Sequence, residues 1–312
     1  MRSRRPYVAS ILAAIFLLAS LSVGSTAERK ALRQSGSAAL FVVYGRPGAN
    51  TYMVPFVIIE GGQFKQAIAG DSDADEISRF TDAYYSRGKK YRVLFGGGEA
   101  GSLTVKKSNK DEECTRTSAD VALTSTARLN RNVMALATDS ASLGGGARSM
   151  RRSPTAAERA ALMPLVRAAF KEKGVPAALL QSFVTVNLTA LDLDNDGKAE
   201  LVGSFVARKM GRGAARYPLF LFAEPKGNSY GTTVLQYERF TSKDIMSGAD
   251  LTAIENGVYV ERLVDALDLD GDGTLEVVTV RDGLEGDGYF IYKKQGGTWK
   301  QVYEFANYKC GF

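Results

Sequence analysis

Histidine is absent from this chain of 312 residues. Its absence excludes Ser-His-Asp and Cys-His catalytic sites, histidine-ligated zinc, and the commonest general base in enzymes. Carboxylates, lysine, tyrosine or a bound metal are the groups left to carry catalysis. We therefore do not expect an enzyme, although a glycosidase that uses a pair of carboxylates stays open as an alternative.

Cysteine is scarce, because the chain contains only Cys114 and Cys310. Neither thiol is expected to act as a nucleophile, since no histidine is present to activate it. In an oxidising compartment we expect the two residues to form a disulfide that ties the N-terminal region to the end of the chain. Two unrelated buried thiols are the alternative.

Long hydrophobic runs are also lacking. The apolar run at residues 11–18 is shorter than the ~20 residues that a membrane span requires. It follows three arginines within the first five residues and precedes the small residues 25–27, which is the layout of a secretory signal peptide at 1–27. We expect cleavage after Ala27, a periplasmic or secreted mature protein, and no stable membrane insertion once the leader is removed. An uncleaved anchor helix, as in a membrane-anchored envelope sensor or assembly factor, is the alternative.

Neither charge sign is in large excess. The chain has 40 Lys+Arg against 34 Asp+Glu, and removing the three arginines of the leader lowers the net charge from +6 to +3. This excess is too small to indicate nucleic-acid binding. With 45% hydrophobic and 24% charged residues, the composition is that of a globular protein large enough for two domains.

What the sequence does contain is an acidic motif that occurs twice, as ALDLDNDGKAELV at 190–202 and ALDLDGDGTLEVV at 266–278. In each copy three aspartates alternate with other residues, a glycine follows, and a glutamate lies four residues after the last aspartate. Such carboxylates repel one another unless a hard cation lies between them, and Ca²⁺ binds oxygen ligands. We therefore expect two calcium sites. Their expected ligands are Asp192, Asp194, Asp196, the Lys198 carbonyl and Glu200 in the first loop, and Asp268, Asp270, Asp272, the Thr274 carbonyl and Glu276 in the second.

The two motifs do not fit an EF-hand. Its twelfth position requires a bidentate glutamate, but here that position is Gly203 in one copy and Thr279 in the other. Each motif is followed by a β-branched run typical of a strand rather than a helix. The residues resemble the FG-GAP/VCBS repeat family, over roughly 183–305. The resemblance implies DxDxDG calcium loops that join the strands of β-propeller-like blades in an exported bacterial protein.

The rest of the chain divides at its glycines and prolines. We expect a mainly β fold with one or two helices (α+β): a small β-rich domain at 38–139, an exposed linker at 140–152, a helical segment at 153–182 and the repeat domain at 183–312. Ser153 is the expected N-cap of a helix that packs on the calcium-loop sheets as a brace. Two blades are too few to close a propeller, so the repeat domain is either an open pair of sheets or takes strands from the N-terminal domain.

Together these features predict an exported calcium-binding protein. Its expected role is non-catalytic binding or structural support at the cell envelope or outside the cell, with a protein or glycan as partner. The alternative in the enzyme class is a carboxylate-based hydrolase of envelope or extracellular glycan.

Overall fold

A computed structural model of the chain describes residues 37–45, 51–69, 73–146, 148–227, 229–245 and 250–309. Within these residues the protein is mainly β, with antiparallel sheets and three α-helices, which confirms the predicted fold class. The predicted leader at 1–27 lies outside the described residues. No helix among those described is long and apolar enough to cross a membrane.

The strands of the N-terminal region form a closed barrel. Pairing runs from β1 through β7, β4, β5 and β6 to β2, and β2 pairs again with β1, while β3 extends the sheet beyond β2. Closure removes the free edges that an open sheet would expose. The strands are β1 (Ser37–Tyr44), β2 (Thr51–Glu60), β3 (Gln63–Gln66), β4 (Lys90–Phe95), β5 (Gly98–Ser108), β6 (Ala119–Ser125) and β7 (Ala135–Thr138).

Helix α2 (Ala74–Tyr84) packs its apolar face on the barrel. Asp73 caps the helix by accepting hydrogen bonds from the first backbone N–H groups of the turn. The ring of Phe41 on β1 is surrounded by Phe80, Tyr85 and Tyr91, with the Tyr91 ring centroid 5.1 Å away. The aromatic residues of this region therefore belong to the core.

Two further sheets, each a four-strand antiparallel meander, follow in the sequence. The first loop sheet contains β8 to β11, with β12 attached to β10, and the second loop sheet contains β13 to β16. In each sheet an acidic loop joins the first strand to the second. The bounds are β8 (Phe183–Leu191), β9 (Glu200–Lys209), β10 (Ala215–Lys226), β11 (Ser229–Tyr237), β12 (Phe240–Thr241), β13 (Glu261–Leu267), β14 (Glu276–Asp282), β15 (Gly286–Gln295) and β16 (Thr298–Tyr308).

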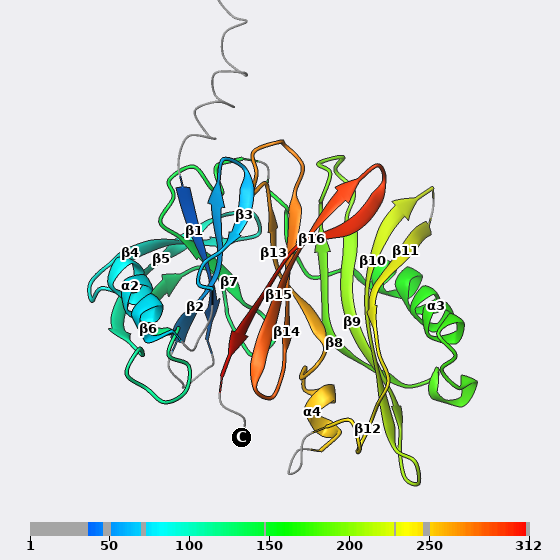
Figure 1. Cartoon of the computed structure of the whole chain (residues 1–312). Helices are drawn as coiled ribbons and strands as arrows, with labels where there is room; N and C mark the ends of the chain where they lie inside the picture. The colour runs from blue at the N-terminus through cyan, green and yellow to red at the C-terminus, as the bar shows by residue number, and fades with distance from the viewer. Residues whose placement is uncertain are drawn as a thin grey trace, which may run out of the picture.

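The barrel, the two loop sheets and helix α3 (Ala156–Glu172) stack as successive layers (Figure 1). One face of the second loop sheet, including Val278 and Ile291, shares a core with the barrel. Its other face packs through Trp299 on Phe222 of the first loop sheet, with ring centroids 4.8 Å apart. The region predicted as the repeat domain thus contains two sheets packed face to face, and no barrel strand pairs with either of them within the described residues.

Helix α3 covers the outer face of the first loop sheet through Leu162, Val166 and Phe170, as predicted for a brace. Its N-cap, however, is Thr155 rather than Ser153. The Thr155 hydroxyl accepts the Glu158 N–H (3.2 Å), and the Glu158 carboxylate accepts the Thr155 N–H (2.7 Å). This reciprocal capping box requires a glutamate three residues after the cap, which Thr155 has and Ser153 lacks. The short elements η1 (Ala177–Leu179) and α4 (Thr252–Glu255) complete the fold.

Part of the segment predicted as an exposed linker is packed against the sheets, while most of its described residues are exposed. Ser149 is fully buried, and the Arg151 side chain is 5% exposed. The Arg151 guanidinium lies 4.3 Å from the Phe95 ring centroid and donates to the Val264 carbonyl. Arg151 thus finds backbone and aromatic partners between the barrel and the second loop sheet, while its neighbours Met150 and Arg152 are exposed.

The predicted disulfide includes Cys310, which lies outside the described residues, so the pairing stays a prediction. The chain segments that precede Cys310 and follow Cys114 do contact each other. The Thr117 hydroxyl donates a buried hydrogen bond of 2.6 Å to the Asn307 side-chain oxygen. Because each partner is three residues from one of the cysteines, this contact brings both chain segments to the same place.

Candidate metal centre

The two acidic loops have the same backbone frame. The strands before and after them end in the equivalent pairs Leu191–Glu200 and Leu267–Glu276. Between these pairs, Gly197 and Gly273 have φ values of +81° and +92°, a region that L side chains rarely adopt. The glycine that follows the third aspartate is thus required by the turn that folds each loop over its own carboxylates.

The first loop gathers three of its five predicted ligands. Asp192, Asp194 and Glu200 each place a carboxylate oxygen within 4.8 Å of the others. Glu200 is 3% exposed, and its Oε2 accepts the Leu193 N–H at 2.7 Å. Asp192 Oδ2 accepts the Gly197 N–H at 3.1 Å, but its buried Oδ1 has no hydrogen-bond partner in the described part of the chain. This oxygen is left for a ligand that accepts a lone pair.

The remaining two predicted ligands of the first loop lie beside this cluster. Asp196 accepts the Lys198 N–H at 2.8 Å, and its other oxygen is 3.1 Å from the exposed Lys198 ammonium. The Asp196 carboxylate is therefore used within the turn. Ligation by Asp196 and by the Lys198 carbonyl stays a prediction.

The second loop repeats this construction. Asp268, Asp270 and Glu276 place carboxylate oxygens within 4.8 Å of one another. The Leu269 N–H donates to Glu276 Oε2 at 2.8 Å, and the Gly273 N–H donates to Asp268 Oδ2 at 3.1 Å, as their equivalents do in the first loop. Asp272 accepts the Thr274 N–H at 2.8 Å. Ligation by the Thr274 carbonyl stays a prediction.

A lysine that the sequence did not single out lies among the carboxylates of the second loop. The Lys293 ammonium is 2.5 Å from Asp270, 2.8 Å from Asp272 and 2.8 Å from Glu276, and its side chain is 13% exposed. The strand register explains this placement. Val277 on β14 pairs with Tyr292 on β15, and the next position along the two antiparallel strands places Glu276 opposite Lys293.

The equivalent position in the first loop sheet is Glu224. It lies with Glu200 one position beyond the Leu201–Ala223 pair of β9 and β10. Glu224 is bound by the Lys294 ammonium at 2.5 Å, which reaches it from the neighbouring second loop sheet. The strand position that holds Lys293 beside the second loop therefore holds a carboxylate, Glu224, beside the first loop.

Burial and crowding perturb the loop carboxyl groups. Burial, together with the charges of Asp194 and Asp192, raises the pKa of Glu200 to about 7, although the hydrogen bond from the Leu193 N–H lowers it. Burial likewise raises the pKa of Glu276 to about 7. The ionised carboxylates are thus unfavourable together unless positive charge lies among them. Donors that are all oxygen, one of them buried and unpaired, fit a hard divalent cation such as Ca²⁺.

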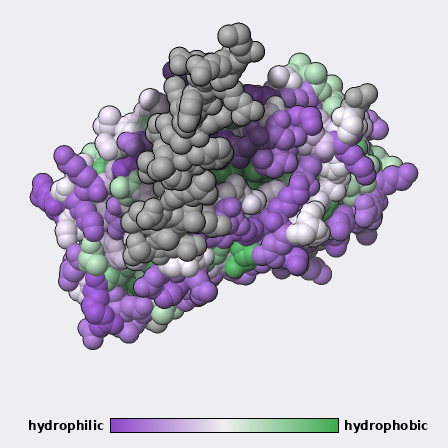
Figure 2. Space-filling view, turned by 90° about the horizontal axis from the view of Figure 1, so that it is seen from above, coloured by the Kyte–Doolittle hydropathy of each residue, from purple (hydrophilic) through white to green (hydrophobic). Residues whose placement is uncertain are grey.

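Both clusters lie where one layer meets the next. Glu200 and Glu224 share a strand face with Val202 and Phe222, which pack on the second loop sheet. At the second loop, the β2–β3 turn of the barrel comes so close that a Cβ on Gly62 would lie 3.4 Å from the Asp270 carbonyl. Figure 2 views the molecule from above, where its visible surface is mostly hydrophilic with small scattered hydrophobic patches.

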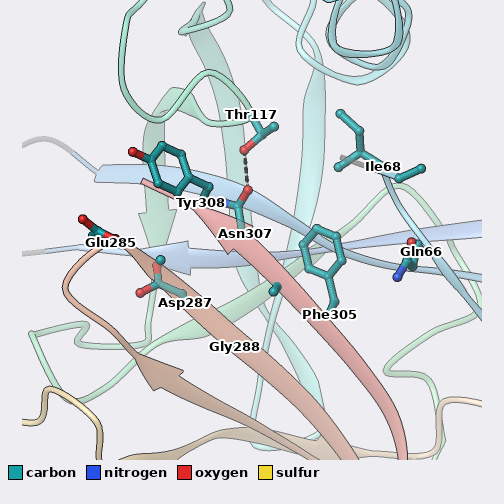
Figure 3. Close-up of a pocket in the computed structure, with 12 residues that line it drawn as sticks. Gln66, Ile68, Thr117, Glu285, Asp287, Gly288, Phe305, Asn307 and Tyr308 are labelled. Carbon is teal, nitrogen blue, oxygen red and sulfur yellow. Dashed lines mark hydrogen bonds between the residues drawn. The ribbon is translucent and has the colours of Figure 1, made fainter. Parts of the chain in front are cut away.

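A pocket of about 510 Å³ lies elsewhere, between β3, the loop around Thr117 and the end of the second loop sheet (Figure 3). Glu285 and Asp287 line it together with Phe305 and Asn307. Burial, reinforced by the charge of Asp282, raises the pKa of Asp287 to about 6. The Lys309 ammonium lies 2.5 Å from this carboxylate, so Asp287 already has a structural counter-ion.

Comparison with protein-family models, with curated proteins and with solved structures gives no match for this chain. The two clusters are therefore candidate metal sites on the chemistry and spacing of their own carboxylates. The resemblance to the FG-GAP/VCBS family stays a proposal.

Proposed function

We propose that this chain is an exported calcium-binding protein of the FG-GAP/VCBS type with a non-catalytic binding or structural role. The observation that carries the proposal is the pair of equivalent loops, each of which brings an Asp-Asp-Glu set of carboxylate oxygens within 4.8 Å. Neither cluster lines the pocket, so these carboxylates do not belong to that cavity.

Calcium bound in these loops would stabilise the stacking of the layers. Each loop joins the first two strands of its sheet and lies beside the next layer, so an ion held there fixes strand ends at a boundary between layers. Extracellular calcium modules have dissociation constants of roughly 10⁻⁴–10⁻³ M, which suits the calcium levels outside the cytoplasm. The rigid, hydrophilic surface of the loops would then bind a protein or glycan partner of the envelope.

Titration of the metal-free protein with Ca²⁺ and with Mg²⁺ tests this proposal. We expect calcium binding in the range given above, and much weaker magnesium binding, because Mg²⁺ demands a smaller octahedral shell. The Asp192→Asn variant should lose the ion of the first loop, whereas Asp287→Asn, a matched change outside both loops, should retain it. Equal calcium binding in the wild type and in a variant with both loops neutralised would refute the proposal.

A hydrolase is the second candidate, because the pocket contains a carboxyl group whose pKa is raised to about 6, as a general acid requires. Glu285 would be the second carboxylate. Under this alternative, Asp287→Asn abolishes hydrolysis of an envelope glycan while calcium binding persists. Loss of hydrolysis only when the loops are neutralised would exclude these two residues as the acid and base.

A further inference from the structure

We propose that the two loops differ in cation affinity because Lys293 is a built-in counter-ion of the second loop: the first loop binds calcium directly, and the second binds it only by displacing this lysine. The inference rests on the proposed calcium function and divides it between the two loops.

The Lys293 ammonium occupies the space that a cation in the second loop would need. The Lys293 ammonium lies 2.5–2.8 Å from oxygens of Asp270, Asp272 and Glu276. Calcium takes oxygen ligands at about 2.3–2.6 Å. An ion that used Asp270 and Glu276 would therefore need the space that the ammonium fills, so the two cations exclude each other.

Displacing the Lys293 ammonium from the second loop costs free energy. The Lys293 side chain is 13% exposed, and Glu276 is fully buried. A buried ammonium with three carboxylate partners is stabilised by all three, and the hydrogen bonds to Asp270, Asp272 and Glu276 raise its pKa although burial alone would lower it. Calcium at the second loop must replace these contacts before it gains its own.

The ion pairs of the first loop differ from those of the second. Among the ion pairs of the described residues, no ammonium contacts Asp192, Asp194 or Glu200. Lys198 bonds only to Asp196, outside the cluster. Lys294 is close enough for the charges of Asp194 and Glu200 to raise its pKa, but Glu224 binds it at 2.5 Å. Glu224 thus binds the Lys294 ammonium that would otherwise be available to the carboxylates of the first loop.

The expected consequence is a two-step calcium response. At low calcium the first loop is filled and the second is closed by Lys293. At higher calcium the second loop exchanges the ammonium for the ion, and the released lysine becomes available to solvent beside the barrel. The boundary between the barrel and the second loop sheet is then the one that responds to changes in calcium.

Calorimetric titration of the full chain with Ca²⁺ tests the inference. In the wild type we expect two binding events whose dissociation constants differ at least tenfold, with Asp192→Asn removing the tighter event and Asp268→Asn the weaker. Lys293→Met should bring the two constants within about threefold of each other, whereas Lys293→Arg should keep them apart. Lys300→Met is the matched control, since Lys300 is exposed, pairs with Lys293 across β15 and β16, and should leave both events unchanged.

The outcomes separate this inference from the function on which it rests. Two events of equal affinity in the wild type, or loss of the tighter event in Asp268→Asn, would overturn the role of Lys293 and leave calcium binding intact. Absence of binding in both the wild type and Lys293→Met would overturn the calcium function itself. If Lys293→Met does not fold without calcium, the wild-type and Asp192→Asn titrations still decide the order of the two affinities.

Discussion

Calcium should raise the melting temperature of the metal-free protein by several degrees. An ion that binds only the folded state adds RT ln(1 + [L]/Kd) to the free energy of unfolding, which is about 2.7 kcal/mol at 100 times Kd. For a protein of this size, 1 kcal/mol corresponds to roughly 1.5–2 °C. Filling the first loop alone should therefore raise the melting temperature by about 4–5 °C.

Differential scanning calorimetry in chelator, in saturating Ca²⁺ and in the same concentration of Mg²⁺ measures this effect. We expect the stabilisation to arise at Asp192, Asp194 and Glu200, whose oxygens lie within 4.8 Å of one another. Asp192→Asn should therefore abolish the shift produced by low calcium. A melting temperature that is the same in chelator and in millimolar Ca²⁺ would refute the reasoning, as would an equal shift in the variant.

Three further predictions concern pH, the brace helix and the cysteines. In chelator, the free energy of unfolding should fall as pH rises from about 4.5 to about 7. The pKa values of Glu200 and Glu276 are raised to about 7 in the folded state, so over this range the folded state keeps protons that the unfolded state has lost. Urea midpoints that do not change over this range would contradict the prediction. Phe170→Ala should cost about 3–5 kcal/mol, since this fully buried ring fills the space between α3 and the first loop sheet; a loss below 1 kcal/mol in chemical denaturation would contradict the brace. Cys310→Ser should cost about 2–5 kcal/mol if Cys114 and Cys310 are paired, and non-reducing peptide mapping that finds two free thiols would exclude the pair.

The sequence predicted most of the strands because their patterns are local. Runs such as 39–44 and 52–59 are rich in β-branched and aromatic residues, and they correspond to β1 and β2. Strand β7 (Ala135–Thr138) has no such local pattern, because it is short and contains two alanines, and it is stabilised by pairing with β1 and β4. Barrel closure depends on such long-range pairs, which a local pattern does not contain.

At the candidate site, too, the local features could be predicted from the sequence and the long-range ones could not. The aspartates, the glycine and the glutamate of each loop are close in sequence, so the repeated motif predicted the carboxylates that the structure brings together. Lys293 and Glu224 come from a neighbouring strand in each sheet, and only the strand register places them beside Glu276 and Glu200. The sequence spacing does not reveal this contrast, because Glu224 follows Glu200 by 24 residues and Lys293 follows Glu276 by 17.

A crystal structure of the protein grown in calcium tests the central claim most directly. We expect an anomalous peak in the first loop at low calcium, with oxygens of Asp192, Asp194 and Glu200 at about 2.3–2.6 Å from the ion. The second loop should show the Lys293 ammonium at low calcium and an ion in its place at high calcium. Water molecules in the first loop at saturating calcium, with its carboxylates turned to solvent, would contradict the account.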